Sequence, residues 1–133
     1  IVQSLVGSEM CIRDRPESFG DVKVTFQVDM KNVNVSGTGV WISGGSISSA
    51  SPGGIQMQPS SSPGLWEAEL TLPPNSNFTF KYRNGYFPNS WSEGWEVVSG
   101  NCTVGQYSDR SVSIGVADTT LPSVCFNMCA ECI

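Results

Sequence analysis

Residues 65–84 read LWEAELTLPPNSNFTFKYRN and contain two runs of alternating side chains separated by a turn. In the first run, Leu65–Leu72, apolar side chains fall on one face and glutamate and threonine on the other, which is the two-residue period of a strand. The second run, Phe78–Arg83, alternates aromatic with polar or basic side chains and predicts another strand. Pro73–Ser76 favours a turn, because proline has no donor for a strand ladder. The segment therefore predicts a β-hairpin.

The outer faces of these two strands carry opposite charges. Glu67 and Glu69 lie on the polar face of the first run, and Lys81 and Arg83 lie on that of the second. If the strands pair, each cross-strand charge pair favours this register by a few tenths of a kcal/mol. We therefore expect all four side chains on a face exposed to water.

The rest of the chain follows the same short alternating pattern, and no segment has an apolar period of 3.6 residues. Further strands are predicted at Val22–Met30, Gly39–Ser43, Ile55–Gln58, Trp95–Val98, Arg110–Val116 and Leu121–Phe126. In Arg110–Val116 we expect the valines and the isoleucine to point inward. About seven short strands separated by turn residues predict an all-β, two-sheet antiparallel β-sandwich of immunoglobulin type, with a small closed barrel as the alternative.

The composition limits the function classes. A chain of 133 residues fits one domain. Its net charge is −5, and its seven basic residues are scattered singly, so it offers no basic patch for nucleic acid. There is no run of about 20 apolar residues, so we expect no membrane insertion. The low charged fraction of 14%, with abundant glycine, serine and proline, is typical of secreted all-β modules.

The first fifteen residues differ from the rest. Leu5–Asp14, LVGSEMCIRD, resembles one reading frame of a transposon adaptor used in preparing DNA sequencing libraries. We therefore expect residues 1–15, and residues 4–15 in particular, to be a translated artefact or a disordered segment outside the natural domain. The ragged start and the abrupt end at Ile133 predict that the chain is a fragment of a longer protein.

Without Cys11, four cysteines remain: Cys102, Cys125, Cys129 and Cys132. The C-x-x-C spacing at the chain end also fits a redox pair or half of a zinc site, but no helix follows it and no histidine is available. Disulfides in an oxidising compartment are favoured. Four cysteines allow three connectivities, and we predict the pairs Cys102–Cys125 and Cys129–Cys132.

Catalysis has few candidate residues. The chain contains no histidine, which excludes histidine-dependent nucleophilic chemistry. The glutamates Glu67 with Glu69, or Glu93 with Glu96, have the spacing of a glycosidase pair. Glu67 and Glu69 fit a solvated strand face better, and no cleft is indicated. We expect no catalytic residue, no metal site and no cofactor.

Aromatic residues gather after the predicted strand that ends at Asn84-Gly85. A flat ring can stack on the apolar face of a sugar while a neighbouring amide or carboxylate binds its hydroxyl groups; the same rings can instead cap the core. If the region binds carbohydrate, we expect stacking by Trp91 and Tyr86 with support from Trp95. Hydrogen bonds would come from Asn89 or Glu93.

Three segments carry a family resemblance: Val24–Met30 (VTFQVDM), Lys81–Gly85 (KYRNG) and Leu121–Phe126 (LPSVCF). With the strand order, they make Asp21–Cys132 resemble a repeated module of secreted bacterial proteins that is similar to starch-binding and glycogen-binding immunoglobulin-like domains. Such modules usually carry a tryptophan segment after the second strand, where this chain has Gly44–Ser49, GGSISS. The resemblance therefore places any glucan site in the later aromatic region.

The resemblance implies a noncatalytic module of a larger secreted or cell-surface protein. We predict that residues 21–126 form the module and that residues 127–133 form a cysteine-containing tail that begins a linker. The expected partners are a polysaccharide or oligosaccharide of the starch type and the flanking domains of the full-length chain. The alternative is a structural spacer domain without a ligand.

Overall fold

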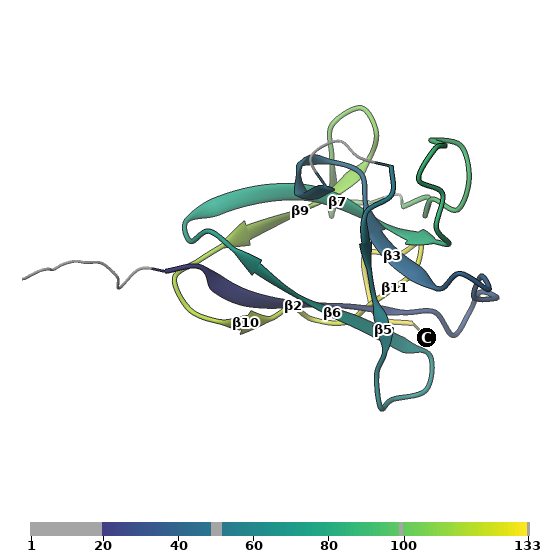
Figure 1. Cartoon of the computed structure of the whole chain (residues 1–133), viewed down its shortest axis with the longest axis horizontal. Helices are drawn as coiled ribbons and strands as arrows, with labels where there is room; N and C mark the ends of the chain where they lie inside the picture. The colour runs from purple at the N-terminus through teal and green to yellow at the C-terminus, as the bar shows by residue number, and fades with distance from the viewer. Residues whose placement is uncertain (1–19, 49–51, 99, 133) are drawn as a thin grey trace, which may run out of the picture.

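The computed structural model describes residues 20–48, 52–98 and 100–132, so the predicted artefact segment lies outside the described residues. Figure 1 shows strands arranged in two layers, each a five-stranded sheet. The prediction of an all-β, two-sheet sandwich is confirmed, with ten described strands instead of about seven. The strands are β2 (Val22–Asp29), β3 (Val40–Ser43), β4 (Ile55–Gln56), β5 (Gln58–Pro59), β6 (Leu65–Leu72), β7 (Ser76–Asn84), β8 (Thr103–Val104), β9 (Asp109–Ile114), β10 (Thr119–Thr120) and β11 (Val124–Cys125). One turn of 3-10 helix, η1, covers Ser46–Ser48.

We call the two layers the β2 sheet and the β7 sheet after their longest strands. The β2 sheet has the order β10-β2-β6-β5, with β11 also paired to β2, and the β7 sheet has the order β4-β3-β7-β9-β8. Most pairings are antiparallel as predicted, but β10 and β11 run parallel to β2. The chain therefore returns to its first strand at the end, because after β9 it crosses from the β7 sheet to the outer edge of the β2 sheet.

Alternating apolar residues from both sheets fill the space between them. Phe26 of β2 meets Phe80 of β7 edge to face, with ring centroids 5.1 Å apart. Fully burying an apolar side chain of this size stabilises the fold by about 1.5–3 kcal/mol. Other buried core residues are Val22, Val24, Val28, Met30, Val40, Ile42, Met57, Leu72, Tyr82 and Ile114.

The predicted β-hairpin of β6 with β7 is wrong. Strand β6 pairs with β2 and β5, whereas β7 pairs with β3 and β9, so the two consecutive strands lie in different sheets. The turn permits this arrangement, because Pro73 and Pro74 have no backbone donor and Asn75 adopts a positive φ of 55°. These residues form an arch that carries the chain from one layer to the other.

The four charged residues that were expected to face one another in this hairpin therefore lie in different sheets. Glu67 and Glu69 lie opposite Gln27 and Thr25 of β2 and are exposed, as predicted, but they do not face Lys81 or Arg83. Lys81 is half-buried, and Arg83 is fully buried. The prediction of an exposed Arg83 is wrong, for reasons given with the site below.

Several other predicted strands differ from the structure, and the one predicted at Leu121–Phe126 is only the two-residue β11. The strand at residues 55–58 is two short strands, because the chain crosses from the β7 sheet to the β2 sheet at Met57, which is fully buried. Residues 95–98 form no strand, and only Trp95 makes an isolated bridge, to Arg83. Strand β9 ends at Ile114, so Val116, predicted to point inward, is 59% exposed.

The four cysteines form two disulfides, but the predicted pairing is wrong. Cys102 bonds Cys129, and Cys125 bonds Cys132. Both bonds fix residues 127–132 against the domain: one joins this segment to the loop before β8, and the other joins it to β11. Within the described ranges, no helix is long and apolar enough to cross a bilayer.

Candidate functional site

A cleft of about 810 Å³ lies beside β7, between the loop that follows β7 and the turn that joins β8 to β9. Ligand-binding pockets usually have volumes of about 300–1,000 Å³. Its lining residues come from four places in the sequence: Gly44 and Gly45 after β3, Lys81 of β7, Trp91 and Trp95–Val98 after β7, and Gln106–Asp109 at the β8–β9 turn.

The first wall of the cleft is built on the buried Arg83. Its guanidinium donates four hydrogen bonds to backbone carbonyls: Nε to Glu93 (2.7 Å), Nη1 to Pro52 (2.6 Å) and Phe87 (3.3 Å), and Nη2 to Ser90 (2.9 Å). Burial lowers the pKa of Arg83, an effect that nearby Glu93 partly opposes. The Arg83 side chain therefore orders the loop after β7 by binding the backbone carbonyls of that loop. These contacts explain why Arg83 is buried and does not lie on the solvated face predicted for it.

Two tryptophans stack outward from this cation. The Arg83 guanidinium carbon lies 3.9 Å from the centroid of the Trp95 ring, a cation–π contact. Trp91 stacks on Trp95 with ring centroids 5.9 Å apart and an angle of 10° between the planes, and Trp95 Nε1 donates to the Trp91 carbonyl (3.0 Å). Trp95 is half-buried inside this stack, whereas Trp91, at its outer end, is 56% exposed.

The floor of the cleft depends on a glycine. Gly44 has a φ of 71°, and a Cβ at this position would lie 3.2 Å from the Trp95 ring. A larger residue would therefore strain the backbone and require the Trp95 ring to shift by a few tenths of an ångström. Gly44 and Gly45, the first two residues of the segment after β3, thus lie at the cleft, with Gly44 against the Trp95 ring.

The second wall carries polar groups and one more ring. Tyr107 is 71% exposed at the β8–β9 turn, next to Gln106 and Asp109. Lys81 Nζ donates to the Ser108 carbonyl (3.3 Å) and so connects the floor to this wall. Partial burial raises the pKa of the Asp109 carboxyl, and the nearby Lys81 cation opposes that rise. The cleft therefore combines exposed ring faces with a cation, a carboxyl and an amide.

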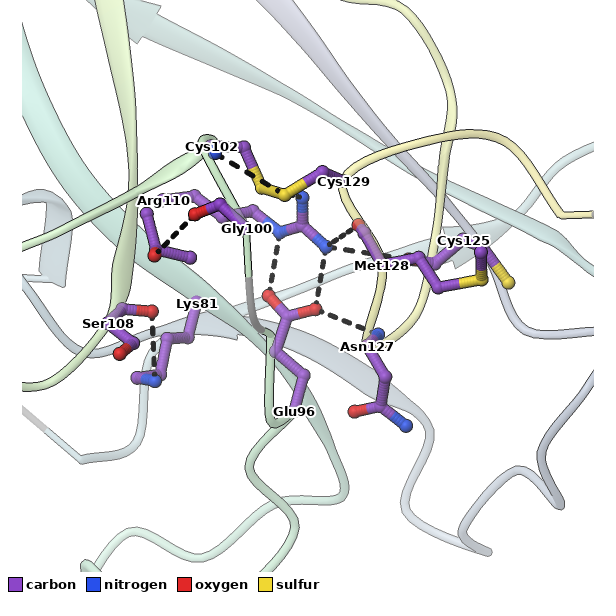
Figure 2. The surroundings of a disulfide bond; sticks show 11 residues. Lys81, Glu96, Gly100, Cys102, Ser108, Arg110, Cys125, Asn127, Met128 and Cys129 are labelled. Atoms are coloured by element: carbon purple, nitrogen blue, oxygen red, sulfur yellow. Dashed lines mark hydrogen bonds and ion pairs between the residues drawn. A yellow bond between two sulfur atoms is a disulfide. The ribbon is translucent and has the colours of Figure 1, made fainter.

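A buried ion pair supports the inner end of the cleft. Arg110 donates to both carboxylate oxygens of Glu96, Nε to Oε2 and Nη2 to Oε1, each at 2.8 Å. Figure 2 shows the guanidinium between this carboxylate and the Met128 carbonyl, with the Cys102–Cys129 disulfide nearby. Glu96 also accepts hydrogen bonds from the backbone N–H groups of Tyr82 (2.9 Å) and Asn127 (3.2 Å).

These four hydrogen bonds give both carboxylate oxygens of Glu96 a partner. Its side chain is fully buried, and both carboxylate oxygens are occupied. Glu93, its proposed partner in a glycosidase pair, is exposed and accepts a hydrogen bond from the Ser90 hydroxyl. The two glutamates therefore have different environments, and the contacts of Glu96 stabilise the fold. In the described ranges, no three His, Cys, Asp or Glu side chains gather where they could hold a metal ion.

The predicted site residues divide into two groups. Trp91 and Trp95 both line the cleft. Tyr86 does not; it stacks on Trp41, with ring centroids 4.4 Å apart, and is 44% exposed. The exposed residues Asn89 and Glu93 also lie outside the cleft lining.

The sequence pattern did not predict the second wall of the cleft. Tyr107 stands alone in the segment Gly105-Gln-Tyr-Ser-Asp109, where no run of aromatics drew attention to it. Asp109 is the first residue of β9, just after this turn. The available signal was a single tyrosine among turn residues shortly before a strand, a position where a large ring has no strand face to bury against.

No protein-family model matches the chain, and no curated protein sequence matches it.

Proposed function

We propose that this protein is a noncatalytic carbohydrate-binding domain and that the cleft between Trp91 and Tyr107 binds a segment of polysaccharide. The observation that carries the proposal is the exposed Trp91 ring in the lining of a cleft that also contains Lys81, Gln106 and Asp109. Flat apolar surfaces beside a few polar groups are the usual composition of small-molecule sites. A pyranose presents the same combination, an apolar face with hydroxyl groups around its edge.

The stacked rings favour binding because they are already ordered. Trp95 contacts both the Arg83 guanidinium and the Trp91 ring, so a sugar that stacks on Trp91 adds to an existing stack. Little side-chain entropy is then lost on binding. Because one open ring face buries few ligand atoms, we expect an affinity of ~mM to tens of μM.

The polar groups of the cleft favour a ligand that carries hydroxyl groups. Lys81 has a cationic amine with three donors, and a single hydrogen bond, to Ser108, is found among the described residues. Asp109 offers carboxylate oxygens on the same side of the cleft. Adjacent hydroxyls of a neutral sugar can accept from the amine and donate to the carboxylate. The preference for α-glucans over other neutral polysaccharides rests on the resemblance to starch-binding modules.

The setting of this function is outside the cytoplasm. Two disulfides are typical of proteins that fold in an oxidising compartment. This supports a secreted or cell-surface domain joined to other domains of a longer chain. The alternative function, a spacer without a ligand, is favoured by the absence of Tyr86, Asn89 and Glu93 from the cleft.

Affinity electrophoresis in native gels that contain starch, glycogen or a β-glucan separates these functions. We expect retardation by starch and glycogen, lost in Trp91→Ala. Tyr86→Ala is the matched control, because it removes another exposed ring outside the cleft. Unretarded migration of the natural protein in every gel would leave the spacer function. Equal loss of retardation in both variants would contradict the assignment of the cleft.

A further inference from the structure

The first and last strands of the domain run side by side in the same direction. Thr119 and Thr120 of β10 lie opposite Val24 and Thr25 of β2. Further along, β11 pairs with the end of β2, with Cys125 opposite Asp29. The terminal segment therefore follows β2 over most of its length.

Hydrogen bonds outside these short ladders close the gaps between them. The Lys23 N–H donates to Asp118 Oδ1 (2.9 Å) at the start of β2. In the middle, the Leu121 N–H donates to the Thr25 carbonyl (2.9 Å), and Gln27 Nε2 donates to the Leu121 carbonyl (2.8 Å).

The far end is fixed in the same way. The Phe126 N–H donates to the Asp29 carbonyl (3.0 Å), just beyond β11. The contacts with the terminal segment thus extend from Lys23 to Asp29. On its other side, β2 pairs with β6 along all eight of its residues. Strand β2 is held on both edges.

This topology determines how the domain responds to a pull on its ends. In Figure 1 the start of β2 lies at one end of the long axis and the end of the chain near the other. Because β2 and β11 are parallel, tension between the two ends acts along the strands, and their hydrogen bonds, which cross between strands, must break together. We propose that the domain is a mechanical element that resists tension by shear of β2 against β10 and β11. This function is independent of carbohydrate binding.

The disulfides carry a pull on the end of the chain to β11 and, through Cys129, to Cys102 in the loop before β8. Cys125 of β11 bonds Cys132, so a pull on the end of the chain reaches β11 directly. The Cys102–Cys129 disulfide encloses β8 to β11 in a covalent loop with a sequence separation of 27. The terminal segment cannot be drawn out while this bond is intact, and β2 is the strand that has to move.

Single-molecule force spectroscopy on the full chain tests the proposal by changing only the direction of pull. One geometry places handles at the two chain ends. The other keeps the first handle and moves the second to Ala117, an exposed residue in the turn before β10. This second pull acts on the same end of both parallel strands and opens their bonds one at a time. We expect the unfolding force to be lower by a factor of about two or more, because single bonds break in sequence. Equal forces in the two geometries would overturn the proposal.

Two matched variants separate mechanical from thermodynamic effects. Gln27→Ala removes the side-chain bond to Leu121 at the sheared interface. Ser113→Ala removes a comparable side-chain bond, from Ser113 Oγ to Asn77 Oδ1 (2.8 Å), between β7 and β9. We expect both to lower the equilibrium stability similarly and only Gln27→Ala to lower the end-to-end unfolding force. The same force change in both variants would contradict the proposal.

Reducing the disulfides gives a further readout in the same experiment. Opening the Cys102–Cys129 loop replaces a Cα–Cα distance of 5.6 Å with 27 residue steps. At about 3.3–3.6 Å per residue, the unfolded contour lengthens by about 90 Å. An unchanged contour length would show that the terminal segment is not enclosed by this bond.

Discussion

The Arg83 guanidinium lies against the Trp95 ring, with its central carbon 3.9 Å from the ring centroid. This contact joins a fully buried cation to the wall of the cleft, because Trp95 lines the cleft and stacks with Trp91. Arg83 itself is fixed by four backbone carbonyls. The shape of the cleft wall therefore depends on a residue that lies beneath it.

Replacing Arg83 tests this dependence. Arg83→Met keeps a long apolar stem but leaves the four carbonyls without their donor and Trp95 without its cation. We expect the free energy of unfolding to fall by about 2–4 kcal/mol, measured by denaturant titration of tryptophan fluorescence. Lys23→Met, which changes an exposed cation of the other sheet, is the control and should stay within about 0.5 kcal/mol of the natural protein. Similar values for the two variants would show that Arg83 does not organise the loop.

The buried ion pair behind the cleft has a different energetic role. Glu96→Gln keeps the shape of the side chain but leaves the Arg110 cation buried without a counter-charge. Breaking such a pair costs about 3–5 kcal/mol. Glu93→Gln makes the same chemical change on an exposed residue three positions away and should change stability by less than about 0.5 kcal/mol. A tolerated Glu96→Gln in thermal denaturation would contradict the structural role of the pair.

The two disulfides differ in the length of chain that they close. For sequence separations of 27 and 7, loop-closure entropy gives stabilisations of about 3.5 and 2.4 kcal/mol. We expect this order when each cysteine pair is replaced by alanine. Mass mapping of an unreduced digest should find Cys102 joined to Cys129 and Cys125 joined to Cys132; any other pairing would be inconsistent with the structure.

The titration of Asp109 makes the stability of the domain depend on pH. Its folded-state pKa is raised by burial, so folding favours its protonated form. The stability from this effect is fully present below the ordinary pKa of 3.8 and is lost as the pH rises through the raised value. We expect Asp109→Asn to show a smaller loss of stability than the natural protein across this interval. Parallel stability curves for the two proteins would argue against the burial of this carboxyl.

The alternation of apolar and polar residues predicted the strands and their buried faces, because a strand must bury one side whatever its partner. It did not predict which strands pair. Two prolines and the positive φ of Asn75 can end a hairpin or form an arch, and only the long-range fit of β6 to β2 decides between them.

The candidate site was predictable in part for a similar reason. Trp91 and Trp95 stand in an aromatic-rich loop, so their clustering is visible in the sequence. Tyr107 reaches the same cleft from a distant turn, which no local pattern reveals. The burial of Arg83 was equally hidden, because an alternating pattern assigns a charged residue to water unless its partners are known. Those partners are carbonyls of two loops with no regular period, one before β4 and one after β7.

The most direct test of carbohydrate binding observes the tryptophans themselves. The chain has four, and their indole N–H signals can be followed by NMR while a soluble linear α-glucan oligosaccharide is added. We expect the signals of Trp91 and Trp95, assigned with single substitutions, to shift in a saturable way, while that of Trp66, packed against the core of the sandwich, stays in place. Unchanged Trp91 and Trp95 signals at millimolar oligosaccharide would contradict the account.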